Sequence, residues 1–289
     1  MKTRVGIVLD STTQIPEEIK EKIPFKVVSL HVTVDGNNRC ETDIKDEEIV
    51  SRLENCKDLK SSSPSIGEFE KAYNEFFEEG IEDILVLTLS KENSATYEVA
   101  KMAVDILAEE KKEHVVVLNT LLNNYGLTNV LYALEPLFKK DISFKEFTGK
   151  AEKYLKNSHL SFTIFDLKHL FRGGRLSKLS CALGLLFKIK PIIEMIDGKL
   201  VLTKKERTTI NIIKYYMNQI ADYASRFKKV LCRFIFLGNN KEHVDKMIEM
   251  VNKNYTNVEY TVATSVGPVF LVHLGNSGFG ISLTGVDEE

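Results

Sequence analysis

The sequence predicts an α/β protein of two domains, an N-terminal domain with a mostly parallel sheet and flanking helices and a C-terminal α+β domain with a mixed sheet. Short apolar runs alternate with helical patterns in the first half, which implies crossovers between parallel strands. The pattern changes near Ser158, and a hairpin signal follows at Asp197-Gly198. We therefore place the domains at 1–158 and 159–278. We leave open that the last strand, 279–286, returns to the first domain.

In the first half, periodicity separates strands of period two from helices of period 3.6. Pro16 followed by two glutamates marks a helix start. Strands are expected at Val5–Leu9, Phe25–Val34, Ile84–Leu89 and Val115–Leu118. Helices are expected after Pro16, over Glu47–Leu53, from Ser65 to Gly80, from Asn93 or Ser94 to Leu107, over Leu127–Phe138 and over Lys145–Asn157. The apolar face of the fourth helix is expected to comprise Val99, Met102, Ala103, Ile106 and Leu107.

The second half has fewer helices and more strands. Asp197-Gly198 joins two apolar runs, a pattern typical of a hairpin. Strands are expected at Leu160–Phe165, Ile189–Ile196, Lys199–Thr203, Val230–Leu237, Val258–Ala263 and Gly280–Thr284, and helices at Arg207–Phe227 and Lys241–Val251.

The composition restricts the class of function. Of the 289 residues, 43% are hydrophobic and 28% charged, as in ordinary folded proteins. A net charge of −2 lacks the basic excess that phosphate contacts with nucleic acid require. The four cysteines form no CxxC pair and have no histidine at metal-ligand spacing, so we expect free thiols and no metal. No apolar run could span a membrane, and Asp10 comes too early for a signal peptide, so we expect a cytoplasmic protein.

Hydroxyl-bearing turns follow the expected parallel strands at Asp10-Ser11-Thr12, at Ser94 and at Asn119-Thr120. Ligands of such sheets gather at the carboxyl ends of the strands, so one crevice lined by hydroxyls is expected. A helix start there also favours an anion, because its first N–H groups lack partners. The alternative is that Ser94 or Asn93 merely caps a helix.

Several side chains can converge on one small anionic group. A carboxylate removed from water needs donors for both oxygens, and hydroxyls with an imidazole N–H can supply them. The candidates are Ser61, Ser62, Ser94, His273, Arg172 and Arg175. Ser94 with His273 could instead form a nucleophile and base, although the chain has no GxSxG motif. It also has no P-loop, GxGxxG or HExxH motif.

The sequence resembles the DegV family along its whole length. Its motifs match those of the family in order and spacing. They are Asp10-Ser11-Thr12 with Pro16, Ser61-Ser62-Ser63-Pro64-Ser65 with Glu68-Phe69, Ser90–Ala100 (SKENSATYEVA), Leu170–Ser177 (LFRGGRLS), Lys188-Ile189-Lys190-Pro191 with Asp197-Gly198, and Gly267-Pro268 with His273 and Gly275. Departures occur at Ser61 and Ser63, which replace threonine and glutamine, at Ala95, which replaces glycine, and at Asn276-Ser277, which replace Pro-Gly.

The resemblance implies a fatty acid bound between the two domains, with no catalytic residue, metal or cofactor. Its carboxylate would be held by Ser61, Ser62, Ser94 and His273, and Arg175, Arg172 and Thr96 would be further network or partner contacts. The family also implies a separate ATP-dependent kinase that converts the carboxylate to an acyl phosphate for phospholipid synthesis. This chain would then be the lipid-binding acceptor subunit.

The second domain offers an apolar wall for the acyl tail, and its basic side chains offer a docking face. The wall would comprise Phe162, Phe165, Phe171, Phe187 and Leu183–Leu186. Between Asp166 and Arg207 there are ten Lys or Arg against four acids. Arg175 and Lys178 are the expected centre of a kinase-docking face. Two alternatives stay open: a serine hydrolase using Ser94 and His273, and a binding module for a small anionic ligand.

Overall fold

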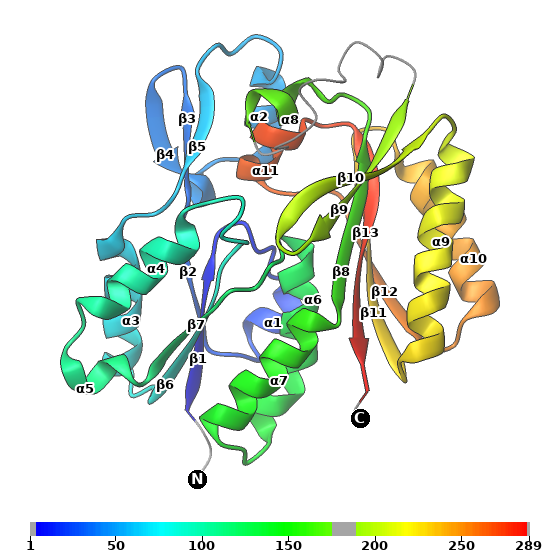
Figure 1. Cartoon of the computed structure of the whole chain (residues 1–289). Helices are drawn as coiled ribbons and strands as arrows, with labels where there is room; N and C mark the ends of the chain where they lie inside the picture. The colour runs from blue at the N-terminus through cyan, green and yellow to red at the C-terminus, as the bar shows by residue number, and fades with distance from the viewer. Residues whose placement is uncertain (1–3, 175–188, 288–289) are drawn as a thin grey trace.

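The computed structural model describes residues 4–174 and 189–287. Its layers run α, β, α, β, α across the molecule, and a small three-stranded sheet lies at one end (Figure 1). A four-stranded sheet has the order β2-β1-β6-β7, and a six-stranded sheet has the order β10-β9-β8-β13-β11-β12. The predicted α/β class is therefore confirmed.

The four-stranded sheet is entirely parallel, as predicted. It comprises β1 (Val5–Asp10), β2 (Phe25–Val28), β6 (Asp83–Leu87) and β7 (Val115–Leu118). Alternate β1 residues pack on opposite faces, Val8 against α3 and α4 and Leu9 against α6 and α7. The helices of this half are α1 (Glu17–Lys20), α3 (Ile66–Glu78), α4 (Thr96–Asp105), α5 (Glu109–Lys112), α6 (Tyr125–Leu134), the 3₁₀ turn η2 (Glu135–Lys139) and α7 (Phe144–Lys156).

The prediction for α4 is wrong in its start and correct in part for its apolar face, because Val99, Ala103 and Leu107 pack in the core. The helix begins at Thr96, and Met102 and Ile106 are 51% and 54% exposed. The buried stripe is Thr96, Ala100 and Ala103, which are spaced i, i+4 and i+7. Ile106 lies beyond the helix, which ends at Asp105.

The predicted strand Phe25–Val34 is divided between two sheets. β2 ends at Val28, and β3 (His31–Val34) forms the three-stranded sheet with β4 (Asn37–Cys40) and β5 (Leu59–Ser62). At the division, Leu30 donates its N–H to Ser11 Oγ and accepts from the N–H of Glu41. These bonds remove Leu30 from both ladders. The 3₁₀ turn η1 (Glu41–Asp43) and helix α2 (Asp46–Arg52) connect β4 to β5.

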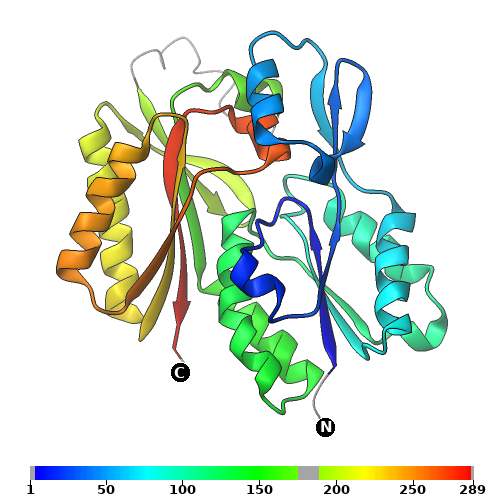
Figure 2. The same cartoon turned by 180° about the vertical axis from the view of Figure 1, so that it is seen from behind.

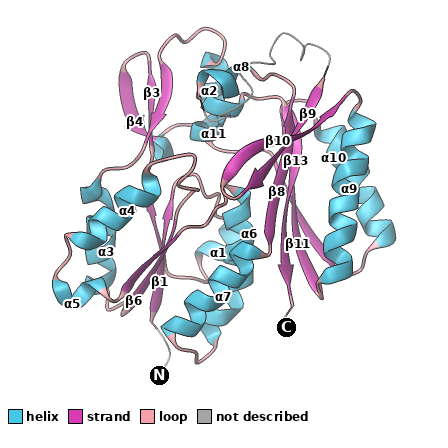
Figure 3. Cartoon of the chain, viewed as in Figure 1, coloured by secondary structure: helices cyan, strands magenta, loops and turns pink. Residues whose placement is uncertain are grey.

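The six-stranded sheet is mixed, as predicted, and the last strand belongs to it. Its strands are β8 (Ser158–Ile164), β9 (Lys190–Ile196), β10 (Lys199–Glu206), β11 (Lys229–Leu237), β12 (Val258–Ala263) and β13 (Gly278–Val286). β13 pairs antiparallel with β8 and β11, so its return to the first sheet does not occur. Helices α9 (Thr209–Arg226) and α10 (Lys241–Asn254) cover the outer face of this sheet (Figure 3).

Helix α6 lies between the two large sheets, as both views show (Figures 1 and 2). Nine of its ten residues are buried, which is expected of a helix covered on all sides. Asn129 on α6 donates to the carbonyl oxygen of Ser282 on β13. The two sheets are therefore joined through one shared helical layer.

Two short helices, α8 (Lys168–Arg172) and α11 (Pro268–Leu274), lie beside the three-stranded sheet. The sequence pattern did not predict α11 as a helix. In the described part of the chain, no helix combines the length and apolarity needed to cross a membrane. The thiols of Cys40, Cys56 and Cys232 are free, and Cys181 lies outside the described residues.

Two buried acids, Asp10 and Glu41, accept hydrogen bonds from the segments that meet at the carboxyl end of β1. Asp10, at the end of β1, accepts from the N–H groups of Thr12 and Leu89, and burial raises its pKa to about 6. Glu41 accepts from the N–H of Val269 at 2.9 Å and from the hydroxyl of Ser11, and burial raises its pKa to about 7. Glu41 therefore joins the end of β1 to the first turn of α11.

The raised pKa of Glu41 predicts that stability depends on pH. The folded state binds the proton more tightly than the unfolded state, whose Glu pKa is about 4.5, so the free energy of unfolding falls as pH rises from about 4.5 to about 7. The Glu41 contribution is about 3 kcal/mol, and Asp10 acts in the same direction. Glu41→Gln should make the loss between pH 5 and pH 8 smaller, measured by urea unfolding.

The exposed neighbour Glu47 provides the control for this measurement. Glu47→Gln should leave the pH dependence of wild type unchanged. Equal losses of stability in wild type and Glu41→Gln would contradict the assignment.

Candidate functional site

A polar opening lies where β5, the turn before α4 and α11 meet. Its free interior volume is about 280 Å³, close to the lower end of the range typical of ligand sites. The Oγ of Ser61 lies 2.8 Å from Nε2 of His273. The polar opening is lined by Leu30, Ser61, Ser62, Ser63, Leu89, Asn93, Ser94, Ala95, Asn123, Leu170, Leu200, Val269, Phe270, His273 and Leu274.

A second group of hydroxyls completes this surface. The Oγ of Ser94 lies 3.2 Å from Oγ of Ser63 and 2.8 Å from Oγ1 of Thr96. Thr96 is fully buried at the first turn of α4, and its N–H donates to Ser94 Oγ. Ser94 is thus fixed by its neighbours rather than acting as a simple helix cap.

The alternation of side chains along β5 separates the neighbouring serines. Ser62 pairs with His31 of β3, and residues opposed in register share one face of a sheet. Ser61 and Ser63 are two residues apart and both bond into the polar opening. Ser62 borders this opening but is exposed on the other face of β5. Ser63, which the sequence pattern did not indicate, therefore takes the position next to Ser94.

His273 is positioned by glycines on two elements. Gly267 and Gly275 flank α11 with φ of 81° and 73°, a region that favours glycine. At Gly173, a Cβ would lie 2.4 Å from Nδ1 of His273. Gly173 is therefore required for close packing against the imidazole, whereas Gly174, with φ of 67°, serves the turn.

The turn that carries Ser94 is hydrogen-bonded to a hairpin of the six-stranded sheet. The carbonyl oxygen of Gly198, in the β9–β10 hairpin, accepts from Ser90 Oγ at 2.8 Å and from Asn93 Nδ2 at 2.7 Å. A Cβ at Gly198 would lie 2.5 Å from Ser90 Oγ. The hairpin therefore bridges the two large sheets beside the polar opening.

The two candidate arginines differ from the other site residues. Arg172 is exposed at the end of α8 and does not line the polar opening, so its role as a network or partner contact stays a prediction. Arg175 lies outside the described residues. None of the described residues that line the polar opening is lysine or arginine.

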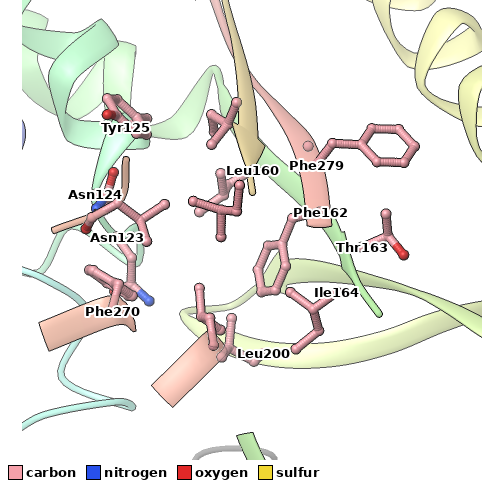
Figure 4. A pocket seen from close by; sticks show the side chains of 15 residues that line it. Asn123, Asn124, Tyr125, Leu160, Phe162, Thr163, Ile164, Leu200, Phe270 and Phe279 are labelled. Atoms are coloured by element: carbon pink, nitrogen blue, oxygen red, sulfur yellow. The ribbon is translucent and has the colours of Figure 1, made fainter. Parts of the chain in front are cut away.

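An apolar cavity with a free interior volume of about 50 Å³ adjoins the polar opening and is shown in Figure 4. The two share Asn123, Leu200, Phe270 and Leu274. The cavity is also lined by Asn124, Tyr125, Leu160, Phe162, Thr163, Ile164, Ile235, Leu237, Val266, Phe279 and Gly280. An elongated apolar molecule with one polar end matches the chemistry of these two neighbouring linings.

The expected apolar wall is correct only in part. Phe162 lines the apolar cavity. Phe165 instead packs against Phe279 and His243 on the opposite face of the sheet, because successive strand residues alternate. Phe171 packs in a small cluster beside Leu170. Phe187 and Leu183–Leu186 lie outside the described residues.

The arrangement suits binding of an anion by neutral donors. Hydroxyls and an imidazole can donate to a carboxylate without a cation. A Ser94–His273 catalytic pair would require a hydrogen bond between these two side chains. The hydroxyl of Ser61 occupies Nε2 of His273 instead, and Ser94 bonds to Ser63 and Thr96.

Comparison with known proteins identifies the relatives of this chain. Residues 4–285 match the family model described as "Uncharacterised protein, DegV family". A DegV domain-containing protein of Staphylococcus aureus is 31% identical over 280 residues, covering 96% of this chain and 98% of the relative. A similar protein of Listeria innocua is 27% identical over 286 residues, covering 98% of this chain and 99% of the relative.

Solved structures share the fold at lower identity. A fatty-acid-binding DegV family protein of Thermus thermophilus has a TM-score of 0.88 at 23% identity, covering 98% of this chain and 100% of that one. A DegV family protein of Eubacterium eligens loaded with heptadecanoic acid has a TM-score of 0.82 at 20% identity, covering 98% and 100%. Together, the family model and the Staphylococcus relative show that this chain belongs to the DegV family.

Proposed function

We propose that the chain binds one long-chain fatty acid, with its tail in the apolar cavity and its carboxylate at the polar opening. The observation that carries this proposal is that the two spaces are neighbours, because Leu200, Phe270 and Leu274 line both. The Thermus thermophilus protein is described as fatty-acid-binding, and a protein of Eubacterium ventriosum as stearic-acid-binding. These likenesses support the same ligand class here.

The carboxylate would lie between the two hydroxyl groups of the site. Ser61 and His273 supply donors from one side, and Ser94, supported by Ser63 and Thr96, supplies a donor from the other. The side chain of Ser62 is left on the outer face of β5 in this proposal. This changes the sequence-based expectation for Ser62 but keeps it for Ser61, Ser94 and His273.

The tail supplies most of the binding free energy. About fifteen methylenes contribute roughly 12 kcal/mol when fully buried, at about 0.8 kcal/mol each. The losses of translational freedom and of ligand flexibility reduce this value substantially. Enough remains for tight binding without a cation at the carboxylate.

We further propose that the bound carboxylate is presented to a separate ATP-dependent kinase, which forms an acyl phosphate for phospholipid synthesis in the cytoplasm. The sequence has no P-loop, and the polar opening has neutral donors. In this role the chain is an acceptor subunit rather than the catalyst. Among the expected basic docking residues, Lys204, Lys205 and Arg207 are exposed, whereas Arg175 and Lys178 lie outside the described residues.

Native mass spectrometry tests the ligand class. The purified protein should carry an adduct with the mass of one fatty acid, or take up one equivalent of added palmitic acid. Excess inorganic phosphate should not displace the fatty acid, because the acyl tail supplies most of the binding free energy. Phosphate would compete only at a site that binds small anions. Absence of both the adduct and the uptake would reject the proposal.

Neighbouring serines provide a matched test of the head-group site. Ser61→Ala should weaken palmitate binding about tenfold or more, because a hydrogen bond to a charged group contributes about 1.5–3 kcal/mol. Ser62→Ala should change affinity by less than about threefold, since this side chain lies on the other face. Isothermal titration calorimetry measures both. Equal losses in the two variants would contradict the assigned orientation.

The presentation of the carboxylate is tested with ATP and hydroxylamine, which traps acyl phosphates. Palmitate-loaded protein and ATP alone should give no hydroxamate, whereas addition of a bacterial fatty acid kinase subunit should give it. That kinase with its own binding subunit is the positive control. Hydroxamate formed by this chain alone, or none formed while the control is active, would contradict the acceptor role.

A further inference from the structure

Three side chains of different chemistry meet on the outer face of the three-stranded sheet. His31 on β3 and Cys40 on β4 are opposed in register and therefore share this face. Glu68 approaches them from the first turn of α3, with its Oε1 3.4 Å from Nε2 of His31. The three ligand atoms all lie within 4.8 Å of one another. No part of the polar opening is formed by these three side chains.

The donor set is selective for the type of cation. An imidazole nitrogen, a thiolate and a carboxylate are ligands of Zn²⁺, whereas Ca²⁺ and Mg²⁺ prefer oxygen alone. With bonds of about 2.0–2.3 Å, ligand atoms of a tetrahedral Zn²⁺ stand about 3.3–3.8 Å apart. The separation of His31 and Glu68 already matches this range.

Supporting contacts hold the carboxylate of Glu68 in place. Its Oε2 accepts from the N–H of Ser65 at 2.7 Å and from Ser65 Oγ at 2.6 Å, in the capping box of α3. Its Oε1 is thereby directed toward His31. Such outer contacts orient the ligands of metal sites.

A second cluster of possible metal ligands differs because a lysine already neutralises its carboxylates. The ligand atoms of Glu54, Asp166 and His169 are equally close together. Here Lys168 Nζ bonds to both carboxylates and already supplies the positive charge. Glu68 instead contacts the imidazole of His31, a residue that can itself bind a metal.

We propose that His31, Cys40 and Glu68 bind one Zn²⁺ ion, with the fourth position open to solvent. The ion would join β3 and β4 to α3 across the segment from Ser61 to Ser65. This segment carries two of the hydroxyl groups of the polar opening. The metal would thus stabilise the backbone beside the head-group site without contacting the fatty acid. This proposal does not depend on the proposed function.

Cobalt provides a spectroscopic test on the full chain after removal of metals with a chelator. Titration with Co²⁺ should give, at one equivalent, a thiolate-to-cobalt charge-transfer band and the strong visible bands of tetrahedral Co²⁺. Added Zn²⁺ should abolish both. Absence of these bands in wild type, or binding seen only at millimolar metal as at scattered surface carboxylates, would overturn the proposal.

Matched variants locate the site. Cys40→Ser should abolish the charge-transfer band, whereas Cys56→Ser should retain it because Cys56 is buried beside Asp35. Glu68→Gln can keep the capping box but should weaken metal binding at least tenfold. Zn²⁺ should raise the melting temperature of wild type but not of Cys40→Ser, whose fold is checked by circular dichroism. A charge-transfer band that persists in Cys40→Ser would refute the assignment.

Discussion

The geometry of the site depends on one buried carboxylate that holds a short helix. The N–H groups in the first turn of a helix have no partner within it. Glu41 accepts from the N–H of Val269 there, while its other oxygen accepts from Ser11 after β1. Because α11 spans only Pro268–Leu274, its position is set by such end contacts. His273 and Phe270 are carried by this helix, so the polar opening and the apolar cavity share one anchor.

A second set of contacts fixes how the two large sheets face each other. Helix α6 fills the space between them and bonds to β13 through Asn129. On the other side of the site, the Gly198 carbonyl bonds to Ser90 and Asn93. Both connections cross from one sheet to the other. The two connections therefore hold the sheets that flank the apolar cavity in a fixed relation.

Sequence patterns predicted where strands and helices lie better than they predicted which strands pair with one another. Apolar periodicity located β1, β6 and β7, but the alternation from Phe25 to Val34 continues through the point where the chain changes sheets. Only the bonds of Leu30 to Ser11 and Glu41 decide that division. Ser63 was missed for a similar reason. The run Lys60–Ser65 is polar except for Pro64, so no apolar alternation indicates which serines face inward.

For the proposed acceptor role, the neutral donors of the polar opening suit a carboxylate that must remain reactive. An arginine would form a bidentate pair with the carboxylate and stabilise its charge strongly. Ser61, Ser94 and His273 offer single hydrogen bonds, which orient the group but neutralise less of its charge. Affinity can then come from the acyl tail, whose burial contributes several times more free energy than these bonds. In the proposed function, the apolar cavity retains the lipid, and the polar opening sets only the direction from which a phosphate can approach.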